Sequence, residues 1–312
     1  MTEKQDYDSE HTMKLSFNGA TTMRADLPTD IRAAAAAGFD CVEIWAAKLR
    51  RFLADNSTGD LKALFAENSI KPLSINSIEH ITFRAERDYD RIKAECEQLS
   101  EIAATIDCPY VVVVPGKLPP REITRDKIVN DSARVLTELA QIAAEHKVAL
   151  AFEFLGQTDC SVQTLDLADE IVRQVNRKNV GLVIDAFHFY AGGSTIEMID
   201  ALDAQRLFIF HIDDAEDLPR EKLTDAHRLL PGLGILPLKE IIAAFHRIGY
   251  GDNVSVELFR PEYWERDAFE LAREAKAAVE KVLSDPQIRN QKAEGSRQQP
   301  VSRENEDQRS KT

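Results

Sequence analysis

Short apolar segments rich in β-branched residues alternate with longer amphipathic segments along most of this chain. The predicted strands are residues 14–18, 40–45, 71–76, 110–114, 148–154, 180–185, 207–213 and 254–258. They are almost continuously apolar, as expected for parallel strands covered on both faces. Strands that alternate with helices in this way are typical of βα units and a parallel sheet.

The segments between these strands carry helix signals. DLPTDIRAAAAAG has Pro28 near its start and Gly38 at its end, which is typical of a helix. Eight βα units in about 270 residues fit an α/β fold of one domain, the (β/α)8 TIM barrel, whose typical size is about 250 residues. The alternative is a doubly wound open sheet, but FNGATT after the first strand lacks the GxGxxG phosphate loop expected there.

The two ends of the chain differ from its middle. Residues 285–312 are rich in Gln, Arg, Glu and Ser and nearly free of large apolar side chains, which predicts a disordered tail. We expect residues 1–12 to be a flexible N-terminus and 13–284 to form the catalytic barrel. The polar, acidic start does not resemble a signal peptide, and no apolar run approaches the ~20 residues of a membrane span. These features predict a cytoplasmic protein without membrane contact.

Charge and cysteine content further narrow the range of possible partners and sites. The net charge is −14, which argues against a nucleic-acid partner because such proteins usually carry a basic face. The four cysteines have no CxxC spacing, and they fit reduced thiols better than disulfides or a structural zinc site.

Metal-binding side chains stand at the ends of four consecutive predicted strands. Asp185 ends the sixth strand, and Glu153 and Glu257 stand next to last in the fifth and eighth. The seventh strand ends in FHID, which supplies His211 and Asp213. One buried acid could be a salt-bridged core residue, but four such residues at the same end of a barrel favour one divalent cation. One imidazole with three carboxylates suits Mn²⁺, Mg²⁺, Co²⁺ or Zn²⁺.

Further polar and aromatic residues are candidates for binding a substrate. His188 lies three residues after Asp185, and the alternative role for it is to cap the next helix. Arg260 follows the last strand, where it could hold substrate hydroxyls or form a surface salt bridge. Arg228 lies in a long connection of the kind that often forms a lid or a binding loop. Asn76 and Trp45 end the third and second strands, with core packing as the alternative for Trp45.

The order Glu, Asp-x-x-His, His, Glu on strands five to eight resembles the xylose-isomerase-like TIM-barrel superfamily of sugar isomerases and epimerases. Within it, the chain is most similar to the 2-keto-myo-inositol (inosose) isomerases of inositol catabolism. The resemblance covers residues 14–283. The segments that carry it are FNGATT, NVGLVIDAFHFYAGGS, FHIDDAEDLP, LLPGLG and VSVELFRPEYW.

This resemblance implies metal ligands at Glu153, Asp185, His211 and Glu257, a substrate-facing His188 and a substrate-facing Arg260. The sequence departs from the family at Gly19 and Pro237, where relatives often have an acid. Asp185 and His188 also resemble endonuclease IV, a relative with a trinuclear zinc site. That enzyme needs additional histidines on strands three and four, where this chain offers only Asn76.

The chemistry implied is proton transfer next to a carbonyl. A polyhydroxy ketone or sugar would bind the cation, an enediolate would form, and Glu153 or Glu257 would act as general base. Return of the proton to the adjacent carbon moves the ketone, which gives an isomerase. The alternatives on the same site are a ketose 3-epimerase, an inosose dehydratase, or a sugar-binding barrel without activity. Apolar helix faces are compatible with a homo-oligomer.

Overall fold

A computed structural model describes residues 13–286 of the chain. The predicted flexible N-terminus and all but the first two residues of the predicted tail lie outside this range. Within residues 13–286, no helix is both long and apolar enough to cross a membrane.

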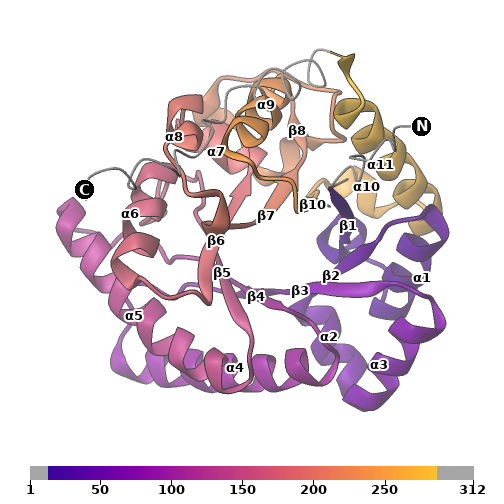
Figure 1. The fold of residues 1–312 in the computed structure, drawn as a ribbon, viewed down its shortest axis with the longest axis horizontal. Coiled ribbons are helices and arrows are strands. Elements are labelled where there is room, and N and C mark those ends of the chain that lie inside the picture. The colour runs from indigo at the N-terminus through magenta and orange to yellow at the C-terminus, as the bar shows by residue number, and fades with distance from the viewer. Residues whose placement is uncertain (1–12, 287–312) are drawn as a thin grey trace, which may run out of the picture.

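Eight parallel strands close into a barrel, with the helices arranged around its outside (Figure 1). The barrel strands are β1 (Lys14–Asn18), β2 (Cys41–Trp45), β3 (Lys71–Ile78), β4 (Tyr110–Val113), β5 (Ala149–Glu153), β6 (Val180–Asp185), β7 (Leu207–Ile212) and β10 (Asn253–Val256). Their order around the barrel is β1-β10-β7-β6-β5-β4-β3-β2, with β2 closing back onto β1. The predicted (β/α)8 fold is confirmed, and the open-sheet alternative is wrong.

The helices are α1 (Leu27–Ala37), α2 (Ala46–Leu53), α3 (Thr58–Glu67), α4 (Glu86–Thr105), α5 (Arg125–Glu145), α6 (Leu165–Val175), α7 (Ala186–Gly192), α8 (Ile196–Asp200), α9 (Leu238–Ile248), α10 (Pro261–Trp264) and α11 (Ala268–Leu283). Their ends follow local chemistry. The Asp26 side chain accepts a hydrogen bond from the Thr29 N–H at the start of α1, and Gly38 ends that helix in the left-handed conformation, with φ of 83°.

Side chains inside the barrel form an apolar layer with a polar layer above it. The apolar layer consists of Cys41, Leu73, Val112, Val114, Ala151, Val183 and Ile209. Because side chains alternate between the two faces of a strand, residues two positions further on also point inward. These positions bring Glu153, Asp185 and His211 together above Ala151, Val183 and Ile209. The barrel register therefore builds the site.

Two strand ends differ slightly from the prediction. β3 continues to Ile78, so Asn76 lies within the strand instead of at its end. β10 ends at Val256, one residue before Glu257. Neither shift moves a side chain out of the barrel mouth, since both Asn76 and Glu257 remain buried there.

The long connection after β7 contains a small antiparallel ladder. It is formed by β8 (Asp214–Ala215) and β9 (Arg228–Leu229), in which Ala215 pairs with Arg228. The loop that follows packs closely, because a Cβ on Gly234 would lie only 2.1 Å from the Ala215 carbonyl oxygen. This connection, of a kind that often forms a lid or a binding loop, is therefore a packed element that places Arg228 inside the protein.

Candidate metal centre

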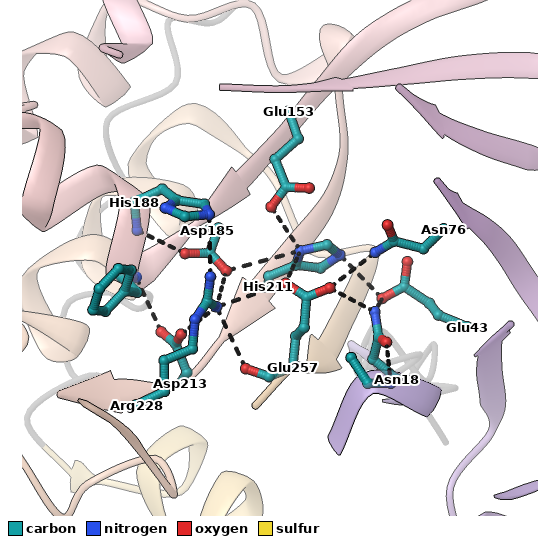
Figure 2. Close-up of polar contacts among 12 residues, drawn as sticks. Asn18, Glu43, Asn76, Glu153, Asp185, His188, His211, Asp213, Arg228 and Glu257 are labelled. Carbon is teal, nitrogen blue, oxygen red and sulfur yellow. Dashed lines mark hydrogen bonds and ion pairs between the residues drawn. The ribbon is translucent and has the colours of Figure 1, made fainter. Parts of the chain in front are cut away.

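Four side chains from adjacent strands converge at the carboxyl end of the barrel. Glu153, Asp185, His211 and Glu257 each offer one ligand atom, and these atoms all lie within 4.8 Å of one another. All four side chains are buried, and Figure 2 shows them pointing toward a common centre. This is the convergence that the strand ends predicted.

Three carboxylates surround one nitrogen of the His211 ring. Nδ1 lies 3.1 Å from Glu153 Oε1, 3.2 Å from Glu257 Oε2 and 3.9 Å from Asp185 Oδ2. Nδ1 is therefore the imidazole atom that faces the carboxylates and is available as a ligand.

The buried charged groups of this site strongly shift one another's pKa values. Burial, together with the nearby Glu257 charge, raises the pKa of Glu153 to about 8. Burial alone would lower the pKa of His211, but Glu257, Glu43 and Glu153 raise it well above its ordinary value. Three carboxylates held this closely repel one another, and a divalent cation relieves that repulsion. The donor set and its charge therefore fit one divalent metal ion.

Two amides fix the orientation of Glu257. Asn18 Nδ2 and Asn76 Nδ2 each donate a hydrogen bond of 2.9 Å to Glu257 Oε1. The other oxygen, Oε2, is left to face His211. Asn76, predicted as a substrate contact, thus contacts a member of the four-residue group.

Glu43 of β2 is part of the site and was not predicted. Its Oε1 lies 3.0 Å from His211 Nε2, on the opposite side of the ring from the other carboxylates (Figure 2). Burial would raise the pKa of Glu43, but its contacts with His211 hold that pKa below the ordinary value. The signal in the sequence is a carboxylate in the middle of the apolar strand CVEIW, whereas the predicted ligands all stand at strand ends.

Arg228 is fully buried beside the four-residue group. Its Nη1 lies 2.5 Å from Asp185 Oδ2 and 2.6 Å from Asp213 Oδ2. Its Nη2 lies 3.0 Å from Asp225 Oδ1. Burial would raise the pKa of Asp185, but Arg228 holds that pKa below its usual range. Asp213, noted at the end of the seventh predicted strand, completes this buried ion-pair network.

His188 joins the network through both backbone and side chain. Its N–H donates to Asp185 Oδ1 at 2.7 Å, so Asp185 caps α7, and its Nε2 lies 3.1 Å from Arg228 Nη2. Burial lowers the pKa of His188, which favours the neutral ring. The Nδ1 atom is buried without a hydrogen-bond partner among the described residues.

The remaining two candidates make contacts outside the four-residue group. Arg260 pairs with Glu216 at 2.6 Å and with Glu262 at 3.3 Å, so the salt bridge that was its alternative role is present. Trp45 is partly buried and packs edge-on against Phe259, with ring centroids 5.5 Å apart. Neither residue belongs to the four-residue group.

Comparison with known proteins places this architecture in a family. A family model described as "Xylose isomerase-like TIM barrel" matches residues 31–281. The chain belongs to this family. Its resemblance to the superfamily, inferred above from the sequence, is therefore confirmed.

Several relatives match nearly the whole barrel. Inosose isomerase of Bacillus velezensis is 43% identical over 274 residues, which cover 87% of this chain and 98% of the relative. Inosose isomerase of Bacillus subtilis is 42% identical, with the same coverage of both chains. The crystal structure of an IOLI protein with a bound zinc atom is 42% identical, with a TM-score of 0.84 over 87% of this chain and 98% of that one.

Proposed function

We propose that this protein is a divalent-metal-dependent isomerase that moves the ketone of 2-keto-myo-inositol (inosose) to a neighbouring carbon, in inositol catabolism. The observation that carries the proposal is the buried group of Glu153, Asp185, His211 and Glu257. The inosose isomerases at 40–43% identity support the choice of substrate. The zinc atom in the IOLI protein supports the choice of a metal.

The four side chains would hold the ion, which can be Mn²⁺, Mg²⁺, Co²⁺ or Zn²⁺. When bound, the ion supplies a Lewis acid that polarises the substrate carbonyl. The protein itself must then move one proton from the carbon next to the carbonyl to the former carbonyl carbon. A second proton must pass from the neighbouring hydroxyl to the former carbonyl oxygen, and the oxygens on which charge develops need hydrogen-bond donors.

Hydrogen bonding favours Glu153 over Glu257 as the base that removes the proton. Glu257 Oε1 already accepts two amide hydrogen bonds, which stabilise its charge and restrict its movement. The hydrogen bonds of the described residues engage only Oε1 of Glu153, through His211. Glu153 therefore has a second oxygen that could accept the substrate proton, and we assign Glu257 to the opposite face of the substrate.

His188 and Arg228 are the donors we assign to the substrate oxygens. Both are buried next to Asp185, and His188 carries a ring nitrogen without a partner among the described residues. Arg260 and Trp45 would act further out, where they shape the mouth of the site. The substrate is a neutral polyol ketone, which needs such donors because each of its hydroxyl groups must be satisfied when it leaves water.

Deuterium exchange tests the proposal directly. The Mn²⁺-loaded protein is incubated in D₂O with inososes and ketoses, and both exchange and product are followed by NMR. We expect deuterium to enter inosose together with formation of the shifted ketone. Formation of an epimer or of a dehydrated product would replace isomerase by ketose 3-epimerase or inosose dehydratase. Absence of exchange with every compound would favour a sugar-binding barrel.

We further infer that the protein works in the cytoplasm without a nucleic-acid partner. All four cysteines are buried and unpaired, which suits a reducing compartment. The net charge of −14 opposes contact with a phosphate backbone. The expected homo-oligomer is tested by the molar mass of the protein in solution.

A further inference from the structure

We propose that Glu43 is a positioning residue that fixes His211 with Nδ1 toward the metal and Nε2–H toward the barrel interior. This inference rests on the proposed metal centre and adds a residue outside its ligand set. Glu43 is fully buried on β2, three strands away from β7 around the barrel.

The two nitrogens of the His211 ring face different surroundings. Nδ1 faces the carboxylates of Glu153 and Glu257, at 3.1 and 3.2 Å. Nε2 faces Glu43 Oε1 at 3.0 Å. Among the described residues, Nε2 makes no hydrogen bond of regular geometry, and Glu43 is the carboxylate that forms an ion-pair contact with it.

The chemistry of imidazole makes this contact necessary. A neutral ring that binds a metal through Nδ1 carries its one proton on Nε2. In a fully buried ring, that N–H costs about 1–3 kcal/mol if it has no acceptor. Glu43 supplies the acceptor and, as an anion, also makes the ring a stronger ligand.

The surroundings of Glu43 direct its charge toward His211. Asn18, Glu43 and Ser74 are register partners on three neighbouring strands, so their side chains point to the same side. Ser74 Oγ donates to Glu43 Oε2 at 2.5 Å, and Asn18 Nδ2 donates to Oε1 at 3.2 Å. Both donors are neutral, so they hold the carboxylate in place without neutralising it.

A merely structural role explains these contacts less well. A buried carboxylate is costly unless it is paired. Asn18 and Ser74 are neutral donors, and the third polar contact of the Glu43 carboxylate is the ring of His211. A glutamine at this position would retain the shape and most of the hydrogen bonds. The anion is therefore explained by what it does to His211.

The test measures metal affinity in Glu43→Gln. Metal-free protein is titrated with Co²⁺ against a competing chelator, and the visible absorption of the bound ion is followed. We expect Glu43→Gln to weaken Co²⁺ binding by about 10- to 100-fold, as is typical when a partner of a metal-bound histidine is lost. Glu95→Gln is the matched control, because Glu95 pairs with Arg50 on the outside of the barrel and should bind Co²⁺ like the unmodified protein.

A second measurement needs no variant at all. In the Zn²⁺-loaded protein with ¹⁵N-labelled histidine, NMR should show the His211 proton on Nε2, shifted downfield by its hydrogen bond to a carboxylate. In Glu43→Gln this proton should move upfield, a change that a loss of general stability would not produce. A proton on Nδ1 in the unmodified protein would overturn the proposal even if the variant did not fold.

The two proposals fail in different ways. Asp185→Asn removes a ligand and should abolish Co²⁺ uptake. If the unmodified protein takes up no Co²⁺, the metal centre itself is wrong. If the unmodified protein takes up Co²⁺, the expected result is that Glu43→Gln binds Co²⁺ at least about tenfold more weakly. An affinity of Glu43→Gln within about twofold of the unmodified protein would overturn only the role of Glu43.

Discussion

Arg228 offers a sharp test of the charge balance around the candidate metal centre. The change is Arg228→Met, which retains an apolar side chain of similar length and removes the guanidinium. In the structure this group is fully buried and lies within 3.0 Å of Asp185, Asp213 and Asp225. Without it, Asp185 and Asp213 share one buried region with no cation between them.

The expected cost follows from these contacts. Removing one partner of a buried ion pair costs about 3–5 kcal/mol, since the remaining charge is left unpaired. Asp225 adds little, because 37% of its side chain is exposed. Burial and the Asp185 charge already raise the pKa of Asp213 well above its ordinary value, so Asp213 will take up a proton and limit the loss. We therefore expect the free energy of unfolding to fall by about 3 kcal/mol, the lower end of that range.

Urea unfolding of the metal-free and Zn²⁺-loaded proteins measures this change. The loss should be smaller in the loaded protein, because the ion compensates Asp185. The control is Arg247→Met, which breaks a surface pair with Asp200 and should cost less than about 1 kcal/mol. If Arg228→Met is no less stable than Arg247→Met, the buried network contributes nothing and our reasoning about the site's charge is wrong.

Three further predictions concern chemistry and stability. Glu153→Gln and Glu257→Gln should each slow deuterium exchange into inosose by at least about 100-fold, and near-normal exchange in either variant would refute its role. Removal of the metal with EDTA should abolish turnover and lower the free energy of unfolding by about 2.7 kcal/mol relative to protein held at 100 times the metal Kd; an unchanged urea midpoint would contradict this. Burial raises the pKa of Cys41, Cys96 and Cys160 to about 11. In the folded protein these thiols should therefore react slowly with a thiol reagent at pH 8, with a rate that rises about tenfold for each pH unit up to that pKa, and they should react rapidly after unfolding. Fast labelling of the folded protein would show that the thiols are accessible.

The sequence predicts the barrel and the four-residue group for one physical reason. Parallel strands buried on both faces are apolar throughout, so a carboxylate or imidazole at a strand end stands out. Asp185 and His211 are such residues, and they are also register partners on neighbouring strands. Because successive side chains alternate between the two faces of a strand, both of these side chains point inward. Periodicity and strand ends therefore suffice for this part of the site.

The position of Arg228 is not determined in this way. It lies in the connection after β7, and its place depends on the pairing of β8 with β9 and on the close packing of Gly234 against Ala215. Such contacts join residues more than ten positions apart without any periodic pattern. The sequence indicates that the loop is long, but the direction of one arginine within it is set by tertiary contacts.

Glu43 can be predicted only in part from the sequence. A carboxylate within an apolar strand must have a partner, so its presence in CVEIW already predicts a buried polar contact. Only closure of the barrel brings β2 near enough to β7 for that partner to be His211. An acid inside a predicted barrel strand is therefore a candidate partner for a metal-binding histidine at a strand end. The ring that binds a metal through one nitrogen needs an acceptor for the other, and in a closed barrel the acceptor can come from a strand that is not adjacent.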